Sequence, residues 1–272
     1  MPRRGSSQLL AVLLMLAAAP AAFGQISLSS SGSYTQGFNS IGAGLPTGWT
    51  VRVFTNATSL GTDVSGSNYR PLNTSWDTTT GQFANYASAL NPGLTGSESS
   101  STQGIQNDRA LGIRQTQGFG DPGAAFTLQL ANTAGYQDFN LSFSGQLLSA
   151  QPKNTVYTVR YGIGAAPSSF TTLGTIDTGT LNGGVFGEDP FTVNAGSLSG
   201  INNVNDTVWI QVVALTAATT TSGNRDTFAI DNVQLTYSPV PEPGTVLAVA
   251  AAGLGLAGLV RRRLRKTDRA AG

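Results

Sequence analysis

Carboxylates are the side chains of this chain that could carry acid–base chemistry. The 272-residue sequence contains no cysteine and no histidine, which excludes disulfides, thiol nucleophiles, serine–histidine–aspartate catalysis and imidazole-bound metals. Glu188 and Asp189 form an adjacent carboxylate pair just before Pro190. A glycosidase needs two carboxyl groups facing each other across roughly 5–9 Å, whereas neighbours on a strand point to opposite sides. We therefore predict a solvated loop here, and keep a secreted carboxylate-dependent glycosidase or lyase as an alternative function.

Four aromatic residues lie among polar residues and could bind a sugar. An exposed ring can stack its π face on the C–H face of a pyranose. The candidates for glycan contact are Tyr69, Trp76, Tyr86 and Tyr136. The same rings could instead close the ends of the fold, and the sequence does not decide between the two roles.

The elements that would position these side chains are strands. Apolar residues alternate with polar ones at 49–53, 126–130, 139–143 and 157–163, which indicates strands with one buried face. Residues 208–215 are almost all apolar, as in a central strand covered on both sides. No segment between the termini has a 3.6-residue apolar period. We predict an all-β fold, an antiparallel β-sandwich or jelly roll.

Residues 56–104 give a weaker signal. Pro71 and Pro92 interrupt the apolar residues, and 97–102 is a polar low-complexity stretch. We expect long loops on a single sandwich, with a mobile insert as the alternative.

In the closing strand the apolar residues switch from even to odd sequence positions. Phe228 and Ile230 share one parity, whereas Val233 and Leu235 share the other. A strand buries both sets on one face only if it contains an extra residue, so we predict a β-bulge at Asp231–Asn232. Asp231 would then accept hydrogen bonds from backbone N–H groups that the bulge leaves unpaired.

Short stretches also carry a resemblance to a known class of fold. Residues 38–51 and 225–235 resemble the opening and closing strands of secreted bacterial jelly-roll domains, which include many carbohydrate-binding modules. In such modules an aspartate at the place of Asp231 can ligate a structural Ca²⁺. The resemblance thus implies, as an alternative to the hydrogen-bonding role, a calcium site made by Asn224, Asp226 and Asp231.

The C-terminal segment combines prolines, an apolar run and a basic block. Val240, Pro241, Glu242 and Pro243 cannot be helical, because proline fixes its own φ and disfavours helix at the residue before it. Residues 245–260 lack charge and proline, and as a helix they would span about 24 Å of a hydrocarbon core of roughly 30 Å. Local thinning of the bilayer, or snorkelling of the flanking arginines, would let this transmembrane helix insert. The basic residues predicted to stop it on the cytoplasmic side are Arg261, Arg262, Arg263, Arg265 and Lys266.

This tail resembles the PEP-CTERM sorting signal of exported Gram-negative bacterial proteins. Its three parts follow one another within residues 239–266, with the motif at 239–244 and a short cytoplasmic tail at 267–272. The resemblance implies that an exosortase recognises Pro241, Glu242 and Pro243 on the outer side of the inner membrane, and that these residues do no chemistry themselves. The alternative is an ordinary C-terminal anchor with a proline-rich stalk.

The N-terminus has the pattern of a signal peptide. A pair of arginines precedes an apolar stretch at 9–19, and Ala22 and Gly24 are small residues at the two positions that a signal peptidase inspects. We expect cleavage before Gln25, after a signal peptide of residues 1–24.

The remaining body, residues 25–238, is large enough for one all-β domain. Of the 15 basic residues 8 lie in the two ends, so the body has 7 basic and 12 acidic residues and a net charge of about −5. It contains a single lysine, Lys153. Nucleic acid is therefore excluded as a partner, because binding its backbone requires clustered basic residues.

Together these features predict an exported, non-catalytic cell-surface or extracellular-matrix protein. Its expected partners are an exosortase, the inner membrane during transient anchoring, and exopolysaccharide. A carbohydrate-binding module with a defined glycan site is the alternative. Apart from the calcium alternative, no cofactor is expected.

Overall fold

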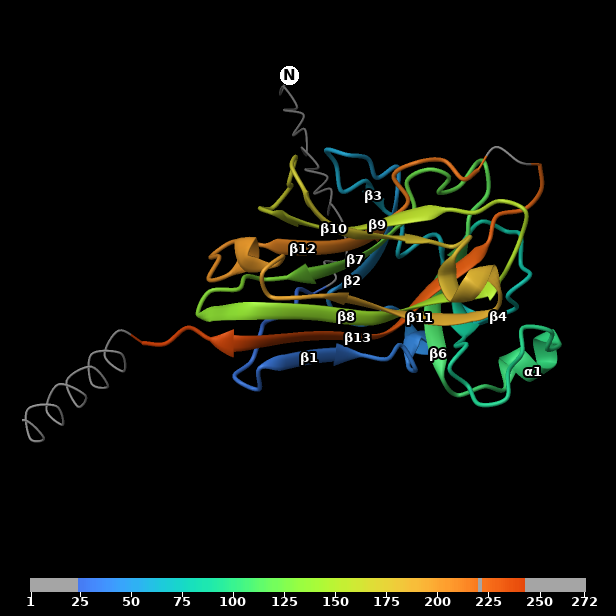
Figure 1. The fold of residues 1–272 in the computed structure, drawn as a ribbon, viewed down its shortest axis with the longest axis horizontal. Coiled ribbons are helices and arrows are strands. Elements are labelled where there is room, and N and C mark those ends of the chain that lie inside the picture. Colours follow the sequence, from blue (N-terminus) through green and yellow to red (C-terminus); the bar gives the residue numbers. More distant parts are fainter. Residues whose placement is uncertain (1–23, 220–221, 243–272) are drawn as a thin grey trace, which may run out of the picture.

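Two β-sheets packed face to face make up the part of the chain that the computed structural model describes, residues 24–219 and 222–242 (Figure 1). The seven-stranded sheet has the order β11-β8-β13-β6-β5-β4, with β1 paired to β13. The six-stranded sheet has the order β10-β9-β12-β7-β2-β3. The prediction of an all-β sandwich is confirmed.

The bounds of the elements are as follows. The seven-stranded sheet consists of β1 (Ser33–Gln36), β4 (Tyr69–Thr74), β5 (Phe83–Ala87), β6 (Arg109–Arg114), β8 (Tyr136–Ser149), β11 (Gly187–Val193) and β13 (Thr227–Pro239). The six-stranded sheet consists of β2 (Trp49–Val53), β3 (Thr62–Asp63), β7 (Ala125–Leu130), β9 (Val156–Ile163), β10 (Thr171–Asp177) and β12 (Val208–Val213). The described helices are short: η1 (Ile41–Ala43), α1 (Ser100–Gly104), η2 (Leu181–Gly184) and η3 (Ser199–Ile201).

The alternating segments of the sequence are strands, as predicted. Residues 49–53 form β2, 126–130 and 157–163 lie in β7 and β9, and 139–143 is the middle of the longer β8. Strand β12 lies between β7 and β9, and all six of its residues are buried. The predicted central strand is therefore confirmed.

The main core lies between the two sheets, where side chains of one parity from each strand meet. Aromatic rings fill its centre: Tyr157 and Phe228 stack with ring centroids 4.2 Å apart, and Phe83 meets Phe126 edge to face at 5.4 Å. A second, smaller cluster lies on the outer face of the seven-stranded sheet, around Trp76 and Tyr86. The part of the sheet around β5 and β6 is thus covered on both faces.

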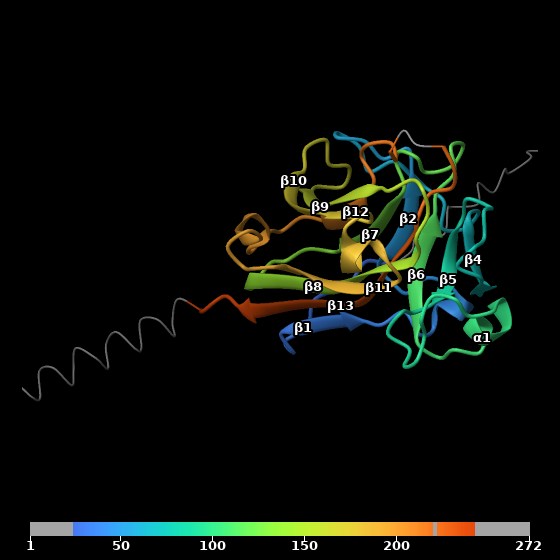
Figure 2. The ribbon, with the colours of Figure 1, turned by 45° about the vertical axis from the view of Figure 1, so that its right-hand side comes forward.

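Residues 56–104 contain more regular structure than the sequence indicated. They include strands β3, β4 and β5 and helix α1. Figure 2 shows β4, β5 and α1 near β6, whereas β3 pairs with β2 in the other sheet. Strand β5 is buried along its whole length, because Phe83 faces the main core while Ala84 and Tyr86 face the second cluster. Strand β4 pairs in parallel with β5, so the seven-stranded sheet is mixed at this edge and the expectation of a purely antiparallel fold is wrong here.

The closing strand β13 contains the predicted bulge. Asp231 pairs with Ser144 and Gln234 with Ser142, so β13 advances by one residue more than β8 between these pairs. Asn232 lies within this interval and has a φ of 48°, a left-handed conformation that asparagine tolerates. The bulge lets Phe228, Ile230, Val233 and Leu235 all reach the main core.

The segments predicted to contact a membrane lie mostly outside the described residues. Within residues 24–219 and 222–242 no helix is long and apolar enough to cross a bilayer. The predicted transmembrane helix at 245–260, its basic stop at 261–266 and the apolar stretch at 9–19 are not part of this range.

Candidate functional site

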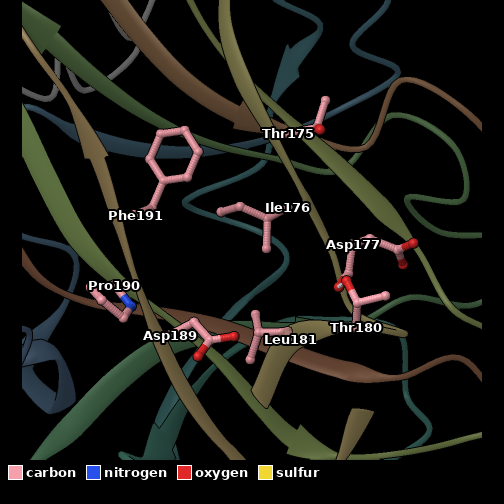
Figure 3. A pocket seen from close by; sticks show the side chains of 8 residues that line it. All are labelled: Thr175, Ile176, Asp177, Thr180, Leu181, Asp189, Pro190 and Phe191. Atoms are coloured by element: carbon pink, nitrogen blue, oxygen red, sulfur yellow. Dashed lines mark hydrogen bonds between the residues drawn. The ribbon is translucent and has the colours of Figure 1, made fainter. Parts of the chain in front are cut away.

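A cleft opens where the edge strands of the two sheets, β10 and β11, lie opposite each other (Figure 3). Its volume is about 200 Å³. The residues that line it are Thr175, Ile176, Asp177, Thr180, Leu181, Asp189, Pro190 and Phe191. The helix η2 joins the two strands by a tight turn, with Asn182 and Gly183 at φ values of 47° and 72°.

The floor of the cleft is apolar. Ile176 and Leu181 are buried and belong to the main core. Phe191 is half-buried and packs against Phe143 of β8, with ring centroids 5.1 Å apart. A Cβ atom at Gly174 would lie 2.9 Å from the Phe191 ring, so this glycine of β10 leaves the space that the ring occupies.

The rim of the cleft carries two exposed carboxylates, and Figure 3 shows them on either side of Leu181. Oδ1 of Asp177 accepts a hydrogen bond from Gly179 N at 2.9 Å, and Oδ2 of Asp189 accepts one from Asn182 N at 2.6 Å. Each side chain is thus fixed by a backbone N–H, while its second oxygen has no partner among the described residues. An apolar floor beneath two oriented acceptors suits a ligand that has both C–H faces and hydroxyl groups.

The adjacent pair Glu188–Asp189 is divided between two surfaces. Glu188 accepts a hydrogen bond from Ser144 Oγ at 2.7 Å on the outer face of the seven-stranded sheet, whereas Asp189 lines the cleft. The prediction that the two side chains point apart is therefore confirmed. The predicted loop is wrong, because both residues lie in the edge strand β11. The sequence missed Asp177 as the second carboxylate, since only the meeting of two sheet edges brings it to Asp189.

The residues of the calcium alternative are not brought together. Asn224 is exposed in the segment before β13, Asp226 is buried directly before the first residue of this strand, and Asp231 is buried within it. Asp226 accepts hydrogen bonds from Thr178 Oγ1 at 2.5 Å and Gln151 N at 2.6 Å. In the described ranges no group of three or more acidic side chains could hold a metal ion. The two aspartates bond to different partners, Asp226 to Thr178 and Gln151 and Asp231 to Ser88, and so do not share a site.

Asp231 instead takes the hydrogen-bonding role that the bulge predicted. Its carboxyl group accepts bonds from Asn232 N at 2.7 Å and from Ser88 Oγ at 2.8 Å. Gln146 Nε2 donates to the same Ser88 oxygen, and Gln146 Oε1 accepts from Ala89 N. Burial raises the pKa of Asp231 to about 7, although the bond from Ser88 acts in the opposite direction.

None of the four aromatic glycan candidates presents an exposed ring. Trp76 and Tyr86 are buried in the second cluster, and Trp76 Nε1 donates to Ala87 O at 2.9 Å. Tyr69 and Tyr136 are half-buried: the Tyr69 hydroxyl donates to Ile41 O, and the Tyr136 ring packs edge-on against Tyr237. Of the two roles left open by the sequence, Trp76 and Tyr86 take the buried one: Tyr86 of β5 and Trp76, from the segment between β4 and β5, pack in the same cluster.

The recognition residues of the tail begin where the sandwich ends. Strand β13 ends at Pro239, and Val240 N donates to Gly135 O at 2.8 Å. Pro241 and Glu242 are exposed, while Pro243 and the basic stop lie outside the described residues. At the other end Gly24 and Gln25 are exposed, and Ala22 lies outside the described range.

Comparison with known proteins identifies the tail. Residues 239–266 match the PEP-CTERM protein-sorting motif, and the chain is thus a PEP-CTERM-sorted exported protein. No curated protein sequence matches the chain.

Solved structures similar to the body include binding and adhesin domains. The CBM22-1 xylan-binding domain of Paenibacillus barcinonensis Xyn10C is 11% identical at a TM-score of 0.38, over 76% of this chain and 95% of that domain. The K3 cleaved adhesin domain of Lys-gingipain from Porphyromonas gingivalis W83 is 11% identical at a TM-score of 0.40, over 75% of this chain and 98% of that domain. The C-terminal family 22 carbohydrate-binding module of Clostridium thermocellum Xyn10B is 12% identical at a TM-score of 0.36, over 82% of this chain and 100% of that module.

Proposed function

We propose that this chain is a non-catalytic cell-surface or extracellular-matrix protein, exported by an N-terminal signal peptide and sorted by an exosortase, whose body associates with exopolysaccharide. The observation that carries the proposal is the PEP-CTERM motif at 239–266, which begins at the last residue of β13. Exopolysaccharide association is the finer part of the proposal, and a defined glycan site would make the body a carbohydrate-binding module.

The geometry of the junction supports recognition of the motif while the body stays folded. Figure 1 shows the segment after β13 leaving the end of the sandwich, and Pro241 and Glu242 are exposed there. Prolines keep this segment extended, so that it suits the cleft of another protein and offers the Glu242 carboxylate for pairing. Between Pro239 and Thr245 an extended chain reaches at most about 20 Å, which would hold the body close to the membrane until the tail is removed.

The cleft between β10 and β11 supports contact with a polysaccharide. Its apolar floor includes one face of Phe191, and its rim offers Asp177 and Asp189 as hydroxyl acceptors. The same geometry argues against the glycosidase alternative for the adjacent pair, because Glu188 is bound to Ser144 on another surface.

The sorting part of the proposal is tested by changing Pro241, Glu242 and Pro243 together to alanine. We expect the variant to cross the inner membrane and to accumulate there at the mass of the uncleaved tail, because export and insertion do not need these three residues. Intact-mass spectrometry of the membrane and surface fractions measures this. An ordinary anchor predicts the same mass and location for variant and parent, and that result would end the sorting proposal.

Association with exopolysaccharide is tested on the processed wild-type protein in the same cells. We expect it to co-sediment with the isolated polysaccharide and to be released when the polysaccharide is digested. Processed protein that appears only in the soluble medium, with normal cleavage, would leave the sorting proposal intact and contradict the matrix association.

A further inference from the structure

Phe54 is a strained and exposed aromatic residue at the end of β2. Its φ is 57°, in the left-handed region that bulky residues seldom occupy, and its side chain is 71% exposed. Among the described residues no other phenylalanine, tyrosine or tryptophan is classed as exposed. A strained backbone that turns an aromatic ring out to solvent does nothing for the core, and such outliers gather at ligand-binding positions.

Two glycines fix the backbone of Phe54 in this conformation. A Cβ atom at Gly123, whose φ is 109°, would lie 2.9 Å from the backbone N of Phe54. A Cβ atom at Gly61, on the other side, would clash with the carbonyl oxygen of Val53. Thr55 N donates to Gly123 O at 3.2 Å. The ring is therefore held on a rigid base, which keeps the entropic cost of binding low.

Beside the Phe54 ring lies a hollow of about 420 Å³, within the usual range for small-ligand pockets. Asn56 and Gln117 line it, and both are exposed. Asn56 Oδ1 accepts from Thr58 N at 3.0 Å, which fixes this side chain. Asn56 Nδ2 and the Gln117 amide have no partners among the described residues and can bond to hydroxyl groups.

Among the residues that the structure describes, none with an unneutralised charge lines the hollow. Its one charged residue, Asp121, forms an ion pair with Arg225 Nε at 2.5 Å and accepts Ala218 N at 2.7 Å. The Asp121 side chain is only 3% exposed. An aromatic face, free amides and the absence of free charge together fit a neutral sugar ring better than a uronic acid or a phosphorylated sugar.

We propose that Phe54 and this hollow bind one pyranose ring of a neutral polysaccharide, with the ring stacked on Phe54 and its hydroxyls bonded to Asn56 and Gln117. The inference rests on the proposed association with exopolysaccharide and names its site and ligand class. The hollow and the β10–β11 cleft lie at the same end of the six-stranded sheet. Asp177 and Val213 pair with the first residues of β9, and Ala125, which pairs with Val213, also pairs with Arg52, two residues before Phe54. Four strand spacings separate β10 from β2, about 19 Å, so one polysaccharide chain could occupy both.

The test measures binding of glucose and xylose hexasaccharides, with hexagalacturonate as the acidic comparison, to the full-length chain in detergent by calorimetry. We expect the wild type to prefer a neutral hexasaccharide. Phe54→Ala should weaken binding at least about tenfold, and Phe54→Trp should keep it. Phe54→Gly should lose binding equally without a lower melting temperature, because glycine adopts the positive φ freely and the ring is not part of the core.

The matched control is Asp189→Asn in the cleft. A smaller loss for this variant than for Phe54→Ala supports the hollow as the main site. Unchanged binding in Phe54→Gly, with loss in Asp189→Asn, overturns the inference and assigns the glycan to the cleft. Preference for hexagalacturonate, or no binding of either neutral sugar, also overturns it, while the sorting proposal depends separately on the mass of the processed chain.

Discussion

The two sheets bury different polar groups on their outer faces. The seven-stranded sheet carries the carboxyl group of Asp231, which is fully buried and bonded to Ser88. The six-stranded sheet carries the guanidinium of Arg160, which is 1% exposed, donates to Gln211 Oε1 at 2.8 Å and lies 3.6 Å from the centre of the Phe170 ring. Each group ties a long loop to its sheet, yet they differ in how they respond to pH.

This difference follows from the pKa values. Burial raises the pKa of Asp231 to about 7, whereas it lowers that of Arg160 to about 10. Asp231 therefore changes its charge near neutrality, with Asp108 as the nearby acidic group that further raises its pKa. Arg160 remains charged throughout the range in which the protein would work. The loop that Asp231 holds should therefore loosen as the pH rises, whereas the loop that Arg160 holds should not.

The largest expected effect is the pH dependence of stability caused by Asp231. Because its folded-state pKa lies above its unfolded value of about 4, the folded state binds more protons between these values. Its contribution is fully present below about pH 4 and is lost as the pH rises through about 7, by at most about 4 kcal/mol. Asp231→Asn should remove this dependence, and urea unfolding of both chains from pH 4 to 8 measures it.

The informative quantity is the difference in the free energy of unfolding between the wild type and Asp231→Asn, because the two proteins share all other carboxyl groups. We expect Asp231→Asn to gain stability relative to the wild type as the pH rises. A constant difference across this range would show that Asp231 is already ionised in the folded protein.

The second prediction concerns Arg160. Its side chain donates to the carbonyl oxygens of Asn56 and Ser59, at 2.9 and 3.0 Å, and so holds the loop after β2. Arg160→Met should lower the free energy of unfolding by about 3 kcal/mol, because several hydrogen bonds to a charged donor are lost and the carbonyls stay covered. The loss should be the same at pH 5 and pH 8, measured by urea unfolding.

The matched control is Arg70→Met on the edge strand β4, where the arginine is half-buried and its side chain has no hydrogen bond to any residue that the structure describes. This change should alter stability by less than about 0.5 kcal/mol. If both variants lose the same amount, Arg160 does not anchor the loop. A loss for Arg160→Met that grows with pH would remove the contrast with Asp231.

The sequence predicted that Asp231 accepts hydrogen bonds but did not predict the burial of Arg160. The bulge at Asp231–Asn232 leaves a parity change within a single strand, so both the irregularity and the bonding role of Asp231 could be inferred. Arg160 alternates with apolar neighbours and was expected on a solvated face. The loop that buries it comes from residues 54–61, about 100 positions away in the sequence. No residue near Arg160 in the sequence indicates this contact.

The same argument explains the aromatic residues. Trp76 and Tyr86 lie among polar neighbours, but they are buried because their cluster also contains Leu148 and Ala229, from distant parts of the chain. Phe54 directly follows the alternating segment at 49–53 and gives no separate signal. Its exposure results from a positive φ that only the glycines packed against it reveal. The sorting motif at 239–266 could be recognised from the sequence, because its residues are contiguous.

The smallest expected change in stability comes from the bulge, which distinguishes β13 from β12, the central strand of the other sheet. Strand β12 keeps a regular register with both neighbours, whereas β13 needs the extra residue at the bulge to place Asp231 under Ser88. Asn232 is exposed there at a φ of 48°. Asn232→Ala should cost about 1 kcal/mol, because alanine meets a steric penalty at positive φ, while Asn232→Gly should stay within about 0.5 kcal/mol of the wild type. Urea unfolding at pH 5, where Asp231 is largely protonated, measures both without interference from its charge. Equal stability of the alanine and glycine variants would mean that the bulge relaxes to an ordinary conformation, and the position of Asp231 would then depend on its bond with Ser88 alone.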